Sequence, residues 1–415
     1  MKVLFMSTYD ITGGAGKGAF RLFKGMQNLT PECYMLVQHK RVYDNTIFQL
    51  TDFTNPLVGN SFLRSHIEIL SAIFFPHKRE VLFSPSIVPE HIYRIPIVNN
   101  SSLIHLHWIT HGFLLIENLQ KFRKSIIWTL HDMWAFTGGC HYTLGCQNYL
   151  NSCGKCPVLG SLRMNDLSKW SWKRKNKSWR DLNLSIVTPS KWLGNCAKRS
   201  SLFKDVPITV IPNGLNTNFY KPYDKIKARR RLSLPEDKKL ILFGADFIRN
   251  PRKGLRFLFE ALFVLKDDPL SQSINLVIFG IGNLDDFPQT GIKTHLLNWL
   301  EKDSSLVMAY SAADVFVCPS IQENLSNTVM EALACGTPCV AFRIGGMPDL
   351  IEHQKTGYLA QPFQVEDLAR GILWALENDN RWIKLSHNSR AKVKSEFELS
   401  KIVRRYFQLY KESVI

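Results

Sequence analysis

The stretch Pro319-Ser-Ile-Gln-Glu-Asn-Leu-Ser-Asn-Thr-Val-Met-Glu-Ala-Leu-Ala-Cys-Gly-Thr-Pro-Cys-Val340 is the most informative part of this chain. The apolar run 315–317 in front of it predicts a buried strand, followed by a loop and then a helix. Glu331 stands eight positions after Glu323, with seven residues between them, and eight positions are slightly more than two helical turns. With Glu323 in the entry loop and Glu331 inside the helix, both carboxylates are expected on roughly one face, directed at one ligand.

The start of this helix adds a second feature. Backbone amides at a helix N-terminus lack partners within the helix and attract phosphate, and here they belong to Leu325, Ser326 and Asn327. Two carboxylates that bind hydroxyl groups beside an anion site are suited to a nucleotide sugar. The plain alternative is a pair of solvated carboxylates on a helix face, the usual explanation for two Glu residues at helical spacing.

The segments around the pair argue against that alternative. Ala312-Ala313-Asp314 precedes the strand, Gly336-Thr-Pro-Cys-Val follows the helix, and Gly345-Gly346 follows the next strand. In this order they resemble the C-terminal signature of the family 4 glycosyltransferases, a large retaining class built on the GT-B fold. The resemblance extends from about Ala312 to Gly357 and is specific.

The resemblance implies a role for each member of the pair. In that family the first Glu contacts hydroxyls of the donor sugar and the second contacts the nucleotide ribose, which points to Glu323 and Glu331 respectively. It also implies donor binding by the residues between them, namely Asn324, Leu325, Ser326 and Asn327. The implied fold is α/β, with two doubly wound parallel-sheet (Rossmann-like) domains that face a cleft.

The length of 415 residues also favours two domains, because a single core rarely extends so far. Short continuous apolar runs indicate parallel strands covered on both faces. These runs are Val3–Met6, Leu103–Trp108, Ile126–Leu130, Ile186–Val187, Ile208–Ile211, Leu240–Phe243, Leu276–Phe279, Val315–Val317 and Cys339–Phe342. We expect an acceptor-side domain at 1–214, a nucleotide-sugar domain at 215–395, and a C-terminal helix at 396–415 that returns to the first domain.

A glycine-rich loop and a histidine mark the N-terminal half. The loop Ser7–Gly18 is not a Walker P-loop, because Gly18 stands where Ser or Thr should coordinate magnesium. Such a loop alone is weak evidence, but in the resembled family it lies against donor phosphates and acceptor, which matches Gly13 and Gly14. His131 ends a predicted strand, and the family commonly carries there a His that contacts the donor sugar. A satisfied structural histidine is the alternative.

A segment with several basic residues follows the strand predicted at 240–243. Lys253 matches the phosphate-binding Lys of the family's Lys-Gly pair, and fixed cations stabilise the charge that develops on a departing diphosphate. The family's usual Arg is missing from its position, so either Arg249 or Arg252 takes its place, and we assign Arg252 to the donor site. Gly280 begins a glycine turn that resembles the family's nucleotide-side turn.

The only metal that we consider from the sequence is one with a structural role. The chain contains no Asp-x-Asp, the usual metal-clamped diphosphate motif of the other main glycosyltransferase fold, so we predict catalysis without a metal or other cofactor. Cys140, Cys146, Cys153 and Cys156 lie within 17 residues. They form either a structural zinc site, a packed loop of reduced thiols, or a redox-active disulfide.

The chain has a formal net charge of +17, and residues 1–214 carry 25 Lys and Arg against 12 Asp and Glu. Within that half, the segment Arg163–Arg180 mixes basic residues with tryptophans, a pattern typical of anionic lipid surfaces. A solvated basic helix with inward tryptophans is an equal alternative, and no nucleic-acid motif accompanies the charge. The apolar stretch Ile67–Phe75 is too short to span a bilayer. We therefore expect a cytoplasmic protein, peripheral on the inner face of the membrane.

The leading hypothesis is a retaining hexosyltransferase that moves a sugar from a nucleotide-diphosphate donor to a saccharide or lipid-linked saccharide, in exopolysaccharide or surface-glycan synthesis. The partners expected are thus a nucleotide sugar, that acceptor and an anionic membrane, with no nucleic acid. A hypothesis from another class is a basic binding protein without turnover, stabilised by zinc. The intact Glu323 and Glu331 pair together with Lys253 speaks against it.

Overall fold

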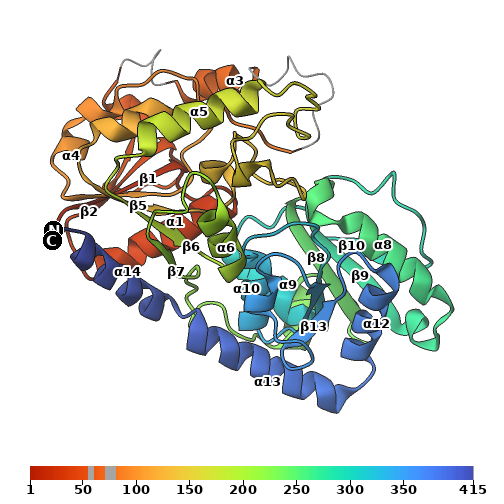
Figure 1. Cartoon of the computed structure of the whole chain (residues 1–415). Helices are drawn as coiled ribbons and strands as arrows, with labels where there is room; N and C mark the ends of the chain where they lie inside the picture. The colour runs from red at the N-terminus through yellow and green to blue at the C-terminus, as the bar shows by residue number, and fades with distance from the viewer. Residues whose placement is uncertain (55–59, 71–80, 415) are drawn as a thin grey trace. The chain divides into compact units, whose positions relative to one another are not determined.

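The computed structural model describes residues 1–54, 60–70 and 81–414. The chain divides into two compact units, each built around its own parallel sheet (Figure 1). Unit 1 comprises Met1–Gly214 together with Ser400–Ile415, and unit 2 comprises Leu215–Leu399. The division thus follows Gly214, and the last segment returns to unit 1.

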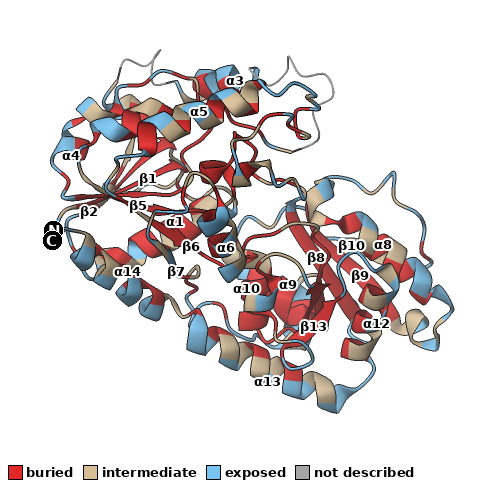
Figure 2. Cartoon of the chain, in the orientation of Figure 1, coloured by how far each residue is buried: buried red, intermediate tan, exposed pale blue. Residues whose placement is uncertain are grey.

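Unit 1 contains a seven-stranded sheet in the order β3-β2-β1-β4-β5-β6-β7, with every neighbouring pair parallel. Its strands are β1 Val3–Tyr9, β2 Cys33–His39, β3 Ile47–Gln49, β4 Leu103–Leu106, β5 Ser125–Thr129, β6 Leu184–Thr188 and β7 Ile208–Val210. The central strands are buried over most of their length (Figure 2), as continuous apolar runs require in a sheet covered on both faces.

Helices cover both faces of this sheet (Figure 1). They are α1 Gly13–Gln27, α3 Ser61–Leu70, α4 Pro96–Asn99, α5 Leu167–Trp179, α6 Lys191–Arg199 and α14 Leu399–Val414. The last of them packs with Ile402, Val403, Tyr406 and Tyr410 buried, which is the helical spacing expected of an amphipathic helix.

Unit 2 contains a six-stranded parallel sheet in the order β10-β9-β8-β11-β12-β13. Its strands are β8 Lys239–Phe247, β9 Ile274–Ile281, β10 Thr294–Leu296, β11 Val315–Cys318, β12 Cys339–Phe342 and β13 Gly357–Ala360. Its helices are α7 Lys225–Arg231, α8 Leu255–Val264, α9 Asp303–Ala312, α10 Asn327–Ala334, α11 Met347–Leu350, α12 Val365–Leu376 and α13 Asp379–Glu396.

The expected α/β class with two parallel-sheet domains is confirmed. Four strands were not predicted, namely β2, β3, β10 and β13, and β8 was predicted to end four residues too early, at Phe243. The extra residues of β8 include an irregular register between Gly244 and Phe247. Among the described residues no helix is long and apolar enough to cross a bilayer. Part of the apolar stretch 67–75, from residue 71 onward, lies outside them.

Candidate functional site

In unit 2 the predicted donor residues gather at the carboxyl edge of the sheet, where open parallel sheets bind ligands. Glu323 lies in the loop between β11 and α10, and its side chain is 8% exposed. Its Oε2 accepts hydrogen bonds from Arg252 Nη1 at 2.9 Å and from Lys253 Nζ at 2.7 Å. Two cations from the short 3-10 turn Pro251–Lys253 therefore converge on one carboxylate.

Two glycines allow this loop to be approached closely. Gly254 has a φ of 71°, and a Cβ on it would lie 1.9 Å from the carbonyl oxygen of Pro319. Gly345 has a φ of 51°, and a Cβ there would lie 2.0 Å from the carbonyl oxygen of Glu323, which also accepts a hydrogen bond from Gly346 N at 3.1 Å. Only glycine tolerates both the left-handed backbone and the contact, so these positions fix where Glu323 stands.

The charge balance at this cluster is unequal. Burial opposes ionisation of Glu323, but Arg252 and Lys253 more than offset it and lower the pKa of this carboxyl to about 2. One negative charge faces two positive charges, so the cluster carries a surplus of one positive charge at neutral pH. An added anion is the natural counterpart of such a surplus.

Glu331 lies inside α10, as predicted, and is 2% exposed. Its Oε2 accepts a hydrogen bond from Tyr310 Oη at 3.0 Å. Tyr310 lies near the end of α9, and burial together with the charge of Glu331 raises the pKa of its phenol. The contact between Tyr310 and Glu331 was not predicted. Tyr310 stands in an apolar helical segment, so the sequence does not distinguish it from an ordinary core tyrosine.

The residues between the two carboxylates form the entry to α10. Ser326 is the N-cap and accepts a hydrogen bond from Val329 N at 3.4 Å, so Asn327 is the first helical residue. Leu325 stands one position before the cap, and Asn324 one position earlier still. All of them except Asn327 are buried, which gives a closed approach to the helix N-terminus.

The two candidate arginines differ in their contacts. Arg249 donates to Asn283 Oδ1 at 2.5 Å and pairs with Asp286, both outside the Glu323 cluster. Arg252 reaches both the carboxylate of Glu323 and the carbonyl of Gln322, the latter at 2.8 Å. These contacts therefore favour Arg252 over Arg249 as the arginine of the donor site.

Gly280 lies near the end of β9, elsewhere on the carboxyl edge of the unit 2 sheet. It has a φ of 135°, and a Cβ on it would lie 1.9 Å from the carbonyl oxygen of Ala245. Ile248 N donates to the carbonyl of Ile281 at 3.0 Å, which ties the glycine turn to the residues after β8.

In unit 1 the glycine loop leads into α1. Gly13 begins the helix with a φ of 68° and Gly14 follows it, while Thr12, the N-cap, makes no side-chain capping bond. Farther along, a Cβ on Gly18 would lie 3.4 Å from His131 Cε1, so the glycine-rich face of α1 lies against the ring of His131. The structure thus brings this helix and the predicted histidine together.

His131 itself is enclosed. Its Nε2 lies 2.9 Å from Nδ1 of His107, and burial lowers the pKa of His131 to about 4 despite the opposing charge of Asp132. The imidazole is therefore neutral at physiological pH.

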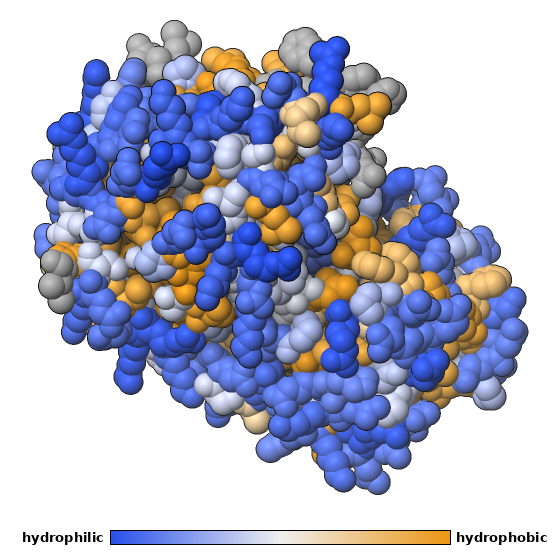
Figure 3. Space-filling model, in the orientation of Figure 1, coloured by the Kyte–Doolittle hydropathy of each residue, from blue (hydrophilic) through white to orange (hydrophobic). Residues whose placement is uncertain are grey.

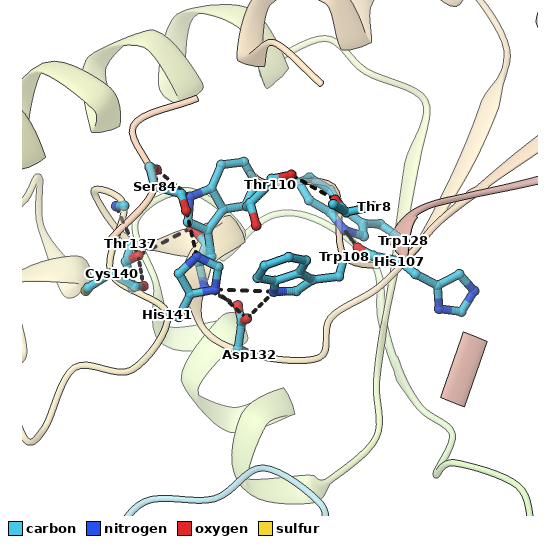
Figure 4. Close-up of polar contacts among 12 residues, drawn as sticks. Thr8, Ser84, His107, Trp108, Thr110, Trp128, Asp132, Thr137, Cys140 and His141 are labelled. Atoms are coloured by element: carbon cyan, nitrogen blue, oxygen red, sulfur yellow. Dashed lines mark hydrogen bonds and ion pairs between the residues drawn. The ribbon is translucent and has the colours of Figure 1, made fainter. Parts of the chain in front are cut away.

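Asp132 joins a polar network shown in Figure 4, where the ring of His141 and the indole of Trp108 both turn towards its carboxylate. Oδ2 of Asp132 lies 2.6 Å from His141 Nδ1 and accepts from Trp108 Nε1 at 2.8 Å, and Oδ1 accepts from Trp134 N at 2.8 Å. Burial would raise the pKa of Asp132, but His141 and these hydrogen bonds hold it below its ordinary value. Through the bond from Trp134 N, Asp132 also caps the short turn that follows it.

Ser84, His141 and Asp132 are arranged in the order of a hydrolase triad, since Ser84 Oγ lies 3.0 Å from His141 Nε2 (Figure 4). Ser84 and His141 are only 1% and 2% exposed, so a substrate carbonyl has no route to the hydroxyl. The hydrogen bonds among the three residues hold the cysteine loop against the end of β5.

The zinc hypothesis for the cysteine loop is not supported. Among residues 1–54, 60–70 and 81–414, no group of three or more His, Cys, Asp or Glu side chains is arranged to hold a metal ion. The four cysteines line one small cavity, together with Tyr149 and Ser168, and all four are free thiols. Burial raises the pKa values of the Cys140, Cys153 and Cys156 thiols, so in the metal-free protein they are protonated.

The basic segment Arg163–Arg180 is less exposed than the sequence indicated. Lys175 is fully buried and donates to the carbonyl oxygens of Trp134 and Thr137. Arg174 pairs with Glu117 at 2.5 Å. Two basic residues of this segment are therefore engaged with groups of the protein itself.

Residues 224–393 match the family model described as "Glycosyl transferases group 1". The match lies entirely within unit 2. An uncharacterized glycosyltransferase of Methanocaldococcus jannaschii is 27% identical over 347 residues, covering 78% of this chain and 86% of that protein. The D-inositol 3-phosphate glycosyltransferase of Geodermatophilus obscurus is 33% identical over 177 residues, which is 39% of each chain.

Several solved structures resemble this chain in fold over nearly its whole length. Sucrose-phosphate synthase from Thermosynechococcus elongatus matches with a TM-score of 0.69 and 18% identity, covering 99% of both chains. Anabaena HepE in complex with UDP-glucose matches with a TM-score of 0.67 and 16% identity over 99% of this chain and 100% of that one. WaaG, a glycosyltransferase involved in lipopolysaccharide biosynthesis, gives a TM-score of 0.62 and 14% identity over 97% and 98%. The fold is thus the GT-B fold of these glycosyltransferases.

Proposed function

We propose that the protein is a retaining family 4 glycosyltransferase that moves a hexose-type sugar from a nucleoside-diphosphate donor to a saccharide or lipid-linked saccharide. The observation that carries this proposal is the cluster in which Arg252 and Lys253 share the carboxylate of Glu323. Its surplus positive charge stands at the carboxyl edge of a parallel sheet, next to the N-terminus of α10, and suits a diphosphate. The group 1 glycosyltransferase match over 224–393 and the fold likeness to a protein bound to UDP-glucose support the same donor class.

In the proposed reaction Lys253 and Arg252 move from Glu323 onto the diphosphate as the donor binds. Glu323 then holds hydroxyls of the sugar, and Glu331 holds the ribose, with Tyr310 fixing its carboxylate. The glycosidic C–O bond to the diphosphate breaks, and the fixed cations stabilise the charge that the leaving group gains. The acceptor hydroxyl attacks from the face that the diphosphate leaves, and a donor phosphate oxygen takes its proton, which retains the configuration.

The remaining donor contacts are assigned from the same edge of unit 2 and from α1. Asn324, Leu325, Ser326 and Asn327 line the approach to α10, while Gly280 borders the nucleotide. Gly13, Gly14 and His131 of unit 1 complete the proposed set, with His131 neutral and suited to a hydrogen bond with a sugar hydroxyl. Because the cations carry out the electrostatic work, the proposed reaction needs no bound metal.

The test is an incubation of the purified protein with a panel of nucleotide sugars, including UDP-glucose, while release of the nucleoside diphosphate is measured with and without saccharide acceptors. Lys253→Ala should lower the rate by about 100- to 1,000-fold, as expected for the loss of one charge at the leaving group. Lys266→Ala serves as the matched control, since Lys266 is an exposed lysine of the same unit. No turnover with any donor, or normal turnover in Lys253→Ala, would refute the proposal.

The proposal also includes where in the cell the protein acts. We assign the acceptor side to unit 1, which carries most of the net positive charge, and a peripheral position on an anionic membrane surface. Exposed apolar residues on α3 (Phe62, Leu63, Ile67, Ile69 and Leu70) lie in the same unit, and Figure 3 shows hydrophobic surface where Figure 1 places α3. A role in exopolysaccharide or surface-glycan synthesis follows from a lipid-linked acceptor. The comparisons do not favour the alternative of a non-catalytic binding protein.

A further inference from the structure

Two adjacent strands of unit 1 end in matched pairs of residues. His107-Trp108 follows β4, and His131-Asp132 follows its parallel neighbour β5. Each member of one pair contacts its counterpart in the other, because His107 Nδ1 lies 2.9 Å from His131 Nε2 and Trp108 Nε1 donates to Asp132 at 2.8 Å. Consecutive residues alternate between faces of a sheet, and Figure 4 shows the ring of His107 pointing away from Asp132. The two contacts therefore lie on opposite sides of the strands.

His107 is held from several directions. Its backbone N donates to the carbonyl of Met6 at 2.9 Å, and its own carbonyl accepts from Trp128 Nε1 at 2.9 Å. Its ring stacks on Phe5, with centroids 5.4 Å apart and planes 13° apart, and stacks on His131 at 5.2 Å. A side chain so restrained can fix the orientation of the group that it touches.

The space behind the pair excludes substrate. A cavity of about 10 Å³ is lined by His107, His131, Thr129, Asn213 and Tyr406, among others. Such a volume holds no more than about one water molecule. His107 thus has no access to a sugar from this side and acts only through His131.

The hydrogen bond between the rings contains one proton, because burial lowers the pKa values of both imidazoles and leaves both neutral. If His131 donated from Nε2, the proton of His107 would sit on its own Nε2. That atom is buried and has no hydrogen-bond partner among the described residues. A buried N–H without a partner is rare, so the arrangement in which His107 Nδ1 donates and His131 Nε2 accepts is favoured.

We propose that His107 is a positioning residue, which fixes the ring orientation of His131 and keeps its proton on Nδ1. This inference rests on the proposed role of His131 at the donor sugar. With the proton on Nδ1, the ring of His131 has one defined tautomer, in which Nε2 accepts from His107 Nδ1.

The decisive measurement is long-range ¹H–¹⁵N NMR on protein labelled at its 12 histidines, which distinguishes the two neutral tautomers. The signal of His131 is identified by its loss in His131→Gln. We expect the Nδ1–H form in the parent protein. His107→Phe keeps a ring against Phe5 but removes the donor, so the His131 signal should change to a mixture of tautomers. His107→Asn places an amide N–H near the former Nδ1 and should restore the parent pattern. An Nε2–H form in the parent, or an unchanged signal in His107→Phe, would overturn the proposal.

A kinetic comparison then connects the tautomer to turnover. With a donor found in the panel described above, His107→Phe should lower kcat by about tenfold or more with a smaller change in KM, and His107→Asn should recover most of the loss. Equal kinetics in His107→Phe and the parent would refute the positioning role even where the tautomer shifts. Because the NMR measurement needs no substrate, it succeeds or fails independently of the proposed activity. Circular dichroism of each variant verifies folding.

Discussion

At the scale of single residues, the two carboxylates of the α10 region have different partners. Glu323 is held by two cations and Glu331 by the phenol of Tyr310. Glu323→Gln should therefore mainly lower kcat, because it removes the charge that holds sugar hydroxyls beside the cations. Glu331→Gln and Tyr310→Phe should both weaken nucleotide affinity, with Tyr310→Phe the milder change. Titration calorimetry with the nucleoside diphosphate checks this, and equal affinity in the parent and in Glu331→Gln would contradict the ribose role.

The ion pairs of Glu323 also make a prediction about pH. The pKa of this carboxyl is lowered from 4.5 to about 2 in the folded protein, so its stabilising contribution is complete above about pH 4.5 and is lost as the pH falls towards 2. By pH 3 the parent should have lost about 2 kcal/mol more of its free energy of unfolding than Glu323→Gln, relative to pH 6. Urea unfolding at both pH values measures the difference. Parallel losses in the two proteins would mean that Glu323 is not selectively stabilised as an anion.

At the scale of elements, α5 divides its cations between the interior and the surface. Lys173, Lys177 and Arg180 are exposed, whereas Lys175 is buried over the ring of Trp134. Changing the three exposed residues to Ser should weaken binding to vesicles of anionic lipid, since each contributes about 1 kcal/mol near such a surface, and added salt should weaken binding of the parent.

The control for this experiment is the neutral vesicle, which should bind both proteins poorly. Lys175 is left in place because its removal would take a hydrogen-bond donor from each of two buried carbonyl groups, those of Trp134 and Thr137. Unchanged binding of the triple variant to anionic vesicles would assign α5 to an ordinary solvated surface.

The elements that were predicted correctly are those whose pattern is local. The strand before Pro319 and the helix containing Glu331 follow from an apolar run and from helical spacing alone. The short edge strands β3, β10 and β13 were missed, and β2 was overlooked although Cys33–His39 is largely apolar. The start and end of elements depend on neighbours, as the extension of β8 to Phe247 beside Ile281 illustrates.

The candidate site was predictable to the extent that charge and spacing reveal it. Lys253 and Glu323 were both named from the sequence, but not their contact with each other, because they lie 70 positions apart. His107 and Trp108 were missed, because the predicted strand 103–108 included them, whereas β4 ends at Leu106. Their place at the strand end, where open parallel sheets bind ligands, appeared only in the structure. The burial of Lys175 had no such signal, since its neighbours on α5 are equally basic.

At the scale of the whole molecule, the proposed reaction depends on fixed cations rather than on a bound ion. Treatment with EDTA should therefore leave turnover unchanged within a factor of about two, since no step of the proposed chemistry uses a metal. The assay is repeated with added magnesium as the control. Immediate loss of turnover that magnesium restores would overturn the metal-free reaction, whatever the donor.

The return of the final helix to unit 1 affects how the protein is made. Tyr406 Oη lies 2.9 Å from Thr129 Oγ1, and Tyr410 Oη lies 2.6 Å from His105 Nδ1, so α14 completes the polar interior beneath β4 and β5. Ribosomes add about 5 to 20 residues per second, so roughly 200 further residues must be translated over about 10 to 40 s before α14 is available. Unit 2 is synthesised entirely within that interval. During translation the unit encoded second can thus reach its final state first, while Thr129 and His105 of the first unit still lack the two tyrosines that complete their hydrogen bonds.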